Sequence, residues 1–135
     1  ESMADALSSN RDRARKRPRL TRKKRAKSRV VPGRVVIKGA LPKRMVSMVI
    51  RKHLNRIKYC YEKELIKKPD LRGKVTSRFV IAASGRVQTA KVYQTTMNHA
   101  PAERCIARVF KRMRFPKPRG GGIVLVTYPL MFQTA

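Results

Sequence analysis

Residues 75–94, VTSRFVIAASGRVQTAKVYQ, decide the fold of this chain. Apolar and polar side chains alternate over 75–81, which is typical of a strand with one buried face, and residues 82–85 supply a loop that closes on glycine. The returning strand covers 86–94, where the apolar positions fall out of phase, so we expect a β-bulge near Gln88. The stretch therefore predicts a β-hairpin.

An amphipathic helix is expected on each side of this hairpin. Apolar residues recur at steps of three and four over 42–68, and Pro69 ends the pattern. A second helix is expected over 101–114, with Asn98 as its N-cap. Its polar face carries basic residues, namely Arg104, Arg108, Lys111 and Arg112.

One strand is expected before the first helix and one after the second. The first is Arg34–Lys38 and the last is Ile123–Phe132. The order is then β-α-β-β-α-β, an α+β fold in which a small antiparallel sheet carries two helices on one face. Because Pro129 has no N–H to donate, and proline is found mostly at sheet edges or bulges, we expect 123–132 to be an edge strand. The alternative is a central strand that is paired on both sides.

The chain is strongly basic. It has 35 Lys and Arg against 7 Asp and Glu, a formal net charge of +28, which argues against cationic substrates and basic partners. About a third of the basic residues fall within 11–29, where few apolar residues occur. We therefore expect residues 1–32 to be a disordered basic linker and 33–135 to be one folded domain. The linker residues expected to contact an anionic surface are Arg15, Lys16, Arg17, Arg22, Lys23, Lys24 and Arg25.

No targeting signal or membrane span is evident. The longest apolar-rich stretch without charge, residues 120–135, is too short for a helix that crosses a bilayer. Residues 3–10 have no apolar run of the kind that secretory signals contain.

Short motifs occur in order along the folded part: Tyr59-Cys60-Tyr61-Glu62, Gly73-Lys74-Val75, Phe79-Val80-Ile81, Gly85-Arg86-Val87, Glu103-Arg104-Cys105, Phe115-Pro116, Gly120-Gly121-Gly122 and Tyr128-Pro129. Together they resemble the C-terminal domain of TonB-type energy transducers, and in particular the cysteine-containing AgmX/PglI branch associated with myxobacterial gliding motility. The resemblance covers roughly residues 35–132.

This resemblance implies a periplasmic interaction domain at the C-terminal end of a protein anchored in the inner membrane. Its partner would be an extended segment of an outer-membrane or periplasmic protein, added as a strand to the edge of the last strand. The residues expected to pair with it are Ile123, Val124, Leu125, Val126, Thr127 and Tyr128. A further hypothesis is that 34–38 pairs with this edge as an internal plug, which a partner displaces.

Cys60 and Cys105 lie on the inner stripes of the two expected helices. A disulfide between them would close the loop 60–105, worth about 4 kcal/mol in the chain-entropy model, and would need an oxidising compartment. Two reduced core thiols in a cytosolic protein are the alternative.

Catalysis and cofactor binding are not expected. His53 and His99 complete no short metal-ligand spacing with the cysteines, and Glu62 and Glu64 point to different sides of a helix. We therefore expect a non-enzyme without metal or cofactor. The basic excess leaves an alternative function, a nucleic-acid-binding module that uses the tail and the basic face of helix 101–114. Anionic envelope polymers and lipid head groups would satisfy the same charge.

Overall fold

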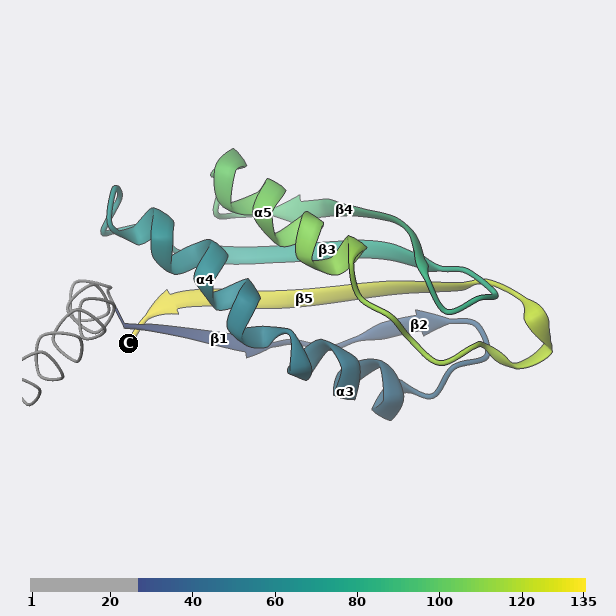
Figure 1. The fold of residues 1–135 in the computed structure, drawn as a ribbon. Helices are drawn as coiled ribbons and strands as arrows, with labels where there is room; N and C mark the ends of the chain where they lie inside the picture. Colours follow the sequence, from purple (N-terminus) through teal and green to yellow (C-terminus); the bar gives the residue numbers. More distant parts are fainter. Residues whose placement is uncertain (1–26) are drawn as a thin grey trace, which may run out of the picture.

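The structure is a computed structural model that describes residues 27–135. Its elements are β1 (Ser28–Pro32), β2 (Val36–Lys38), α3 (Lys43–Lys52), α4 (Leu54–Leu65), β3 (Gly73–Ile81), β4 (Val87–Thr95), α5 (Ala100–Lys111), η1 (Arg119–Gly121) and β5 (Val124–Thr134). The strands form one antiparallel sheet in the order β1-β5-β3-β4, with β2 also paired to β5, and the helices lie on one face of it (Figure 1). The predicted α+β class is confirmed, with one strand and one helix more than expected.

The last strand is central, which corrects the expectation of a free edge. On one side β5 pairs with β3 along the whole of Gly73–Ile81. On its other side it pairs with β1 and β2, which follow each other along the same strand. Of the segment 34–38, which we hypothesised to pair with this strand as a plug, Val36–Lys38 does pair with residues 125–127.

Pro129 fits in the central strand because its backbone faces the gap between β1 and β2. In a strand the N and O of one residue point to the same side, and the Pro129 carbonyl accepts a hydrogen bond from Gly33 N–H at 2.9 Å. The missing N–H of Pro129 therefore faces 33–35, the turn that separates β1 from β2. The proline interrupts the ladder on this side only, and the β3 side is unaffected.

The domain begins earlier than the expected boundary at residue 33. Ser28–Pro32 is a strand of the sheet, so it does not belong to a disordered linker. Its only β-branched residues are the adjacent Val30 and Val31, which follow a basic run and show no alternation typical of a strand. Ser28 also donates a hydrogen bond to the Glu62 carboxylate at 2.5 Å, which ties β1 to α4.

The hairpin forms as predicted, with β3 and β4 joined by 82–86. Gly85 has a φ of +92°, and a Cβ there would lie 2.2 Å from the Phe115 carbonyl oxygen, so only glycine fits. The bulge expected at Gln88 is confirmed, because the pairing passes from Thr89 to Val87. A second shift, between Gln94 and Val92, leaves Tyr93 as another bulged residue.

The first predicted helix is divided in two at His53, and its second part ends at Leu65. The His53 ring Nδ1 donates to the carbonyl of Val49 at 2.9 Å, and its backbone N–H bonds to Ile50 instead. A side chain that takes over an i−4 carbonyl interrupts the helical ladder, which explains the break.

α5 begins at Ala100, two residues after the predicted N-cap. Asn98 has a positive φ of 53°, and His99 is the N-cap. The Thr95 hydroxyl oxygen accepts the N–H groups of Met97 and Asn98, so the turn is capped from the end of β4.

The core lies between the helices and the sheet. Phe79 stacks on Phe110 and Phe115, with ring centroids 5.1 and 5.6 Å apart. The Tyr61 hydroxyl, buried against Phe132, donates to the Leu71 carbonyl, and burial raises its pKa. Within residues 27–135, no helix is long and apolar enough to cross a membrane.

Cys60 and Cys105 form a disulfide that links α4 to α5, with a Cα–Cα distance of 5.6 Å. The predicted cysteine pairing is confirmed. The loop that the disulfide closes contains β3 and β4, so the bond joins the helix before the hairpin to the helix after it.

Removing the disulfide is expected to lower the free energy of unfolding by about 2–4 kcal/mol, because the unfolded chain regains the freedom of the 60–105 loop. The measurement is urea unfolding of the Cys60→Ala/Cys105→Ala double variant against the oxidised protein. Equal midpoints would show that the bond adds nothing to stability.

Candidate functional site

The residues predicted to bind a partner strand lie in the middle of the sheet. Val124, Val126 and Tyr128 face the helices and are buried, whereas Leu125 points to the uncovered face and is 43% exposed. Ile123 precedes β5 and is exposed. The backbone edge of 125–127 is covered by β2 alone, so access to it depends on how firmly β2 is held.

β2 is a weak cover. It has three residues and three register pairs with β5, against nine for β3. None of its side chains is fully buried, and only Ile37 packs against the core. Val35, just before it, is buried and anchors the segment to the domain.

A hollow of about 570 Å³ opens beside this cover. It is bordered by the turn between β1 and β2 and by α3, and Tyr128 of β5 lines it. Burial raises the pKa of Tyr128, although a hydrogen bond with Ser47 opposes the shift. The turn at 33–35, which the Pro129 backbone faces, borders this hollow.

The other end of the sheet is protected against strand addition. Within residues 27–135, no strand pairs with the outer edge of β4. Its bulges at Gln88 and Tyr93 interrupt a regular row of donors and acceptors, and Lys91 is exposed between them. Bulges and charges of this kind are common means of blocking an edge. The Arg78 guanidinium lies 3.4 Å from the Tyr93 ring centroid, which fixes the second bulge by a cation–π contact.

A groove of about 410 Å³ lies between α4 and α5, next to the disulfide. It is lined by Asn55, Arg56, Tyr59, Cys60, Cys105, Arg108, Val109 and Arg112. The basic residues that line it come from both helices, and none of the lining residues is acidic. The sequence places Arg108 and Arg112 on a basic helix face. Their approach to Arg56 depends on the antiparallel packing of α4 and α5, which periodicity does not reveal.

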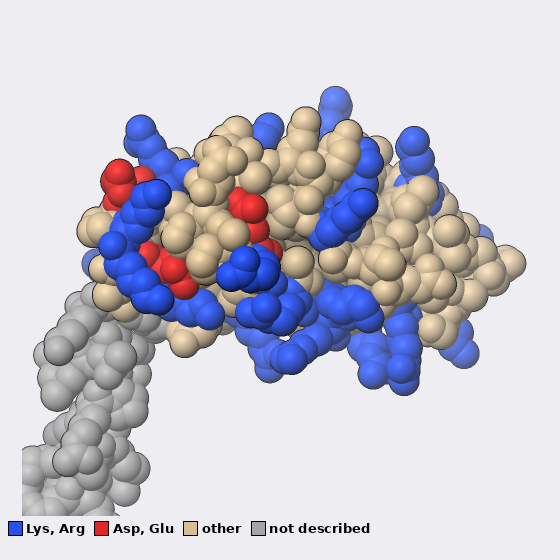
Figure 2. Space-filling model, turned by 90° about the horizontal axis from the view of Figure 1, so that it is seen from above, with Lys and Arg blue, Asp and Glu red and all other residues tan. Residues whose placement is uncertain are grey.

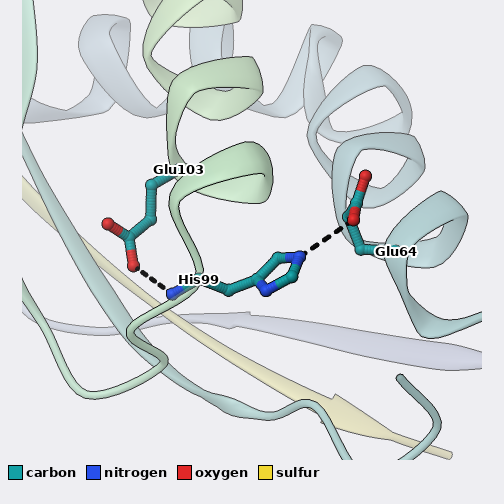
Figure 3. A network of polar contacts seen from close by, with 3 residues as sticks. All are labelled: Glu64, His99 and Glu103. Carbon is teal, nitrogen blue, oxygen red and sulfur yellow. Dashed lines mark hydrogen bonds and ion pairs between the residues drawn. The ribbon is translucent and has the colours of Figure 1, made fainter. Parts of the chain in front are cut away.

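Past the disulfide, away from the groove, a polar network joins the same two helices (Figure 3). His99 Nε2–H donates to the Glu64 carboxylate at 2.9 Å, and His99 backbone N–H donates to Glu103 at 2.9 Å. Thr95 also donates to Glu103. The hydrogen bond from His99 lowers the pKa of Glu64, although burial opposes this shift.

The charged residues are unevenly distributed. Figure 2 shows the acidic side chains within one part of the visible face, with basic ones beside them, while Lys and Arg are spread along its whole length. The acidic residues of the described chain are Glu62, Glu64, Asp70 and Glu103. Three of them lie in the last turns of α4 or at the start of α5, whereas Arg56, Arg108 and Arg112 lie at the other end of this helix pair.

The cysteines, histidines and acidic residues considered for chemistry take part in structural contacts. Residues 27–135 contain no group of three or more His, Cys, Asp or Glu placed to hold a metal ion. Both cysteines are engaged in the disulfide. The predicted anionic-surface residues, from Arg15 to Arg25, lie outside the described residues.

Glu64→Gln is expected to lower stability at neutral pH by about 1 kcal/mol, because a charged acceptor for His99 is lost. A carboxyl group whose pKa is lower in the folded than in the unfolded chain stabilises the fold at pH values above the unfolded pKa, which is near 4.5 for Glu64. This contribution is lost as the pH falls through the folded pKa. The difference from wild type should therefore shrink below about pH 4 in urea titrations. Asp70→Asn, at an exposed turn, is the control, and a difference independent of pH would refute the pairing.

Comparisons with known proteins yield one structural likeness. Neither a model of a known protein family nor a curated protein matches the chain. It is similar to the solution NMR structure of the Pseudomonas aeruginosa TonB CTD, at 17% identity and a TM-score of 0.33. The match covers 78% of this chain and 83% of that chain. A likeness this distant assigns neither a family nor a function.

Proposed function

We propose that this chain is a non-catalytic protein-interaction domain that binds an extended partner segment on β5, in the place that β2 occupies. The observation that carries the proposal is the size of the cover: Val36–Lys38 alone pairs with residues 125–127 of a strand whose other side is fully paired. A partner strand would replace the same backbone hydrogen bonds, so the exchange loses little hydrogen-bonding energy.

The cost of the exchange lies in side-chain burial. Displacing 34–38 exposes Val35, which is 8% exposed in the closed state, and the inner side of Ile37. Full exposure of one such side chain costs about 1.5–3 kcal/mol. A partner that places an apolar side chain at each position recovers this energy. Side-chain matching at 35 and 37 would therefore give the site its selectivity.

Strand addition at β5 is favoured over the sheet edges. The bulges of β4 leave no regular ladder to extend, and β1 contains Pro32, which cannot donate. The uncovered face beside 125–127 is apolar at Leu125 of β5, which lies exposed and provides a contact for outward side chains of a partner.

The setting we propose is the periplasm, in an envelope-spanning complex for energy transduction or motility, with the chain as the C-terminal part of a protein anchored in the inner membrane. The disulfide supports an oxidising compartment. The resemblance to the AgmX/PglI branch supports gliding motility as the process, and outer-membrane or periplasmic proteins as partners.

The test is binding of a labelled peptide with the sequence of residues 28–40 to the intact chain. In wild type the tethered copy competes at high effective concentration, so we expect weak binding. The Val35→Asn/Ile37→Asn variant weakens the tethered copy, and affinity for the peptide should rise by about tenfold or more. Fluorescence anisotropy measures the affinity, and amide shifts at 124–128 identify the site.

The matched control is Val31→Asn/Val36→Asn, which makes the same change at positions that are 42% and 47% exposed. It should leave peptide affinity near the wild-type value. Ile37→Asn alone serves if the double variant unfolds. Equal affinities in all variants, or shifts along β4 instead of β5, would refute strand exchange.

Nucleic-acid binding is a second candidate, favoured by the many Lys and Arg side chains on the face that Figure 2 shows. It predicts strong binding of mixed-sequence DNA at about 150 mM salt with a steep salt dependence. The interaction-domain proposal predicts weak binding under the same conditions.

A further inference from the structure

We propose that the groove between α4 and α5 is a second binding site, which takes an acidic peptide segment with a large apolar side chain at its centre. This site is separate from β5, since none of its lining residues belongs to the sheet. It does not depend on strand exchange.

The floor of the groove is apolar. The Cys60–Cys105 disulfide and Val109 lie at its base, and Tyr59, which is 52% exposed, stands at its side. Cys60 itself is buried, whereas Cys105 is partly exposed. A volume of about 410 Å³ is within the range of sites that bind organic ligands, so it can accept a large side chain with the backbone around it.

The rim of the groove is cationic. Arg56 comes from the first turn of α4, and Arg108 and Arg112 from the last turn of α5 and its C-cap. Guanidinium groups bind carboxylates through paired hydrogen bonds, and they do so with less loss of hydration than lysine. No acidic residue lines the groove, so the carboxylates that pair with these three arginines would come from the ligand.

Two contacts beside the groove join its helices. The disulfide and the Glu64–His99 bond hold α4 and α5 together on one side of the groove, where the acidic residues of α4 and α5 also lie. The groove lies beside Arg56, Arg108 and Arg112, away from these carboxylates. An acidic segment bound there would pair with the arginines of the groove, which sets its position along the helices.

The apolar side chain at the centre of the ligand distinguishes binding in this groove from general attraction of polyanions to a basic protein. Any polyanion is drawn to a chain of net charge +28, and salt screens that attraction beyond about 8 Å at physiological ionic strength. A peptide anchored between the helices should retain affinity under these conditions, because burial of the apolar side chain is not screened.

The test uses two labelled peptides of the same charge, one with a Leu-Phe pair between aspartates and one with glycines in place of the pair. At about 150 mM salt we expect the first to bind about tenfold more tightly than the second. Arg108→Gln/Arg112→Gln should weaken its binding by about tenfold or more. The control of equal charge loss, Arg86→Gln/Lys117→Gln, changes residues outside the groove and should have little effect.

The apolar part of the site has its own matched pair of variants. Tyr59→Ser removes the side wall without changing charge, and Tyr93→Ser makes the same change at a bulge of β4 with similar exposure. Only Tyr59→Ser should reduce the preference for the Leu-Phe peptide. Equal binding of the two peptides, equal losses in both arginine and control variants, or tighter binding of a DNA oligonucleotide that competes for the groove would overturn the proposal.

Discussion

The fold depends on one strand that is bonded on both sides. β5 pairs with all of β3 and, on its other side, with the two short strands at the beginning of the described chain. Pro129 divides that second side because its missing N–H faces the turn at 33–35. Proline is rare in the interior of a sheet, and here Pro129 lies where the pairing on this side of β5 is interrupted between β1 and β2. The weak part of the cover, β2, lies over the residues that we propose a partner reaches.

The helical layer is held together independently of this exchange. The disulfide and the Glu64–His99 bond both join α4 to α5, and neither involves β1, β2 or β5. Displacement of residues 34–38 would therefore leave the helix pair and its groove in place. This separation allows two partner segments, one extended and one acidic, to bind the same domain on different surfaces.

Periodicity predicted the hairpin, the bulge at Gln88, both amphipathic segments and the cysteine pair, because each depends on neighbours near in sequence or on a shared core. It failed where a distant contact decides the structure. Pro129 indicated an edge strand, since the sequence does not show that its backbone meets Gly33. Ser28–Pro32 was assigned to the basic tail because its strand character comes from pairing with β5. The convergence of Arg56 with Arg108 and Arg112 likewise follows from helix packing.

Native-state hydrogen exchange tests the central claim most directly, because it needs no partner and reports each strand separately. If the cover on β5 opens by itself, the amides of 36–38 will exchange through a local opening of much lower free energy than that of the β3–β5 ladder. They will also do so with little dependence on denaturant. If 36–38 and the β3–β5 ladder exchange with the same free energy, the cover opens only when the whole domain unfolds, and the account is wrong.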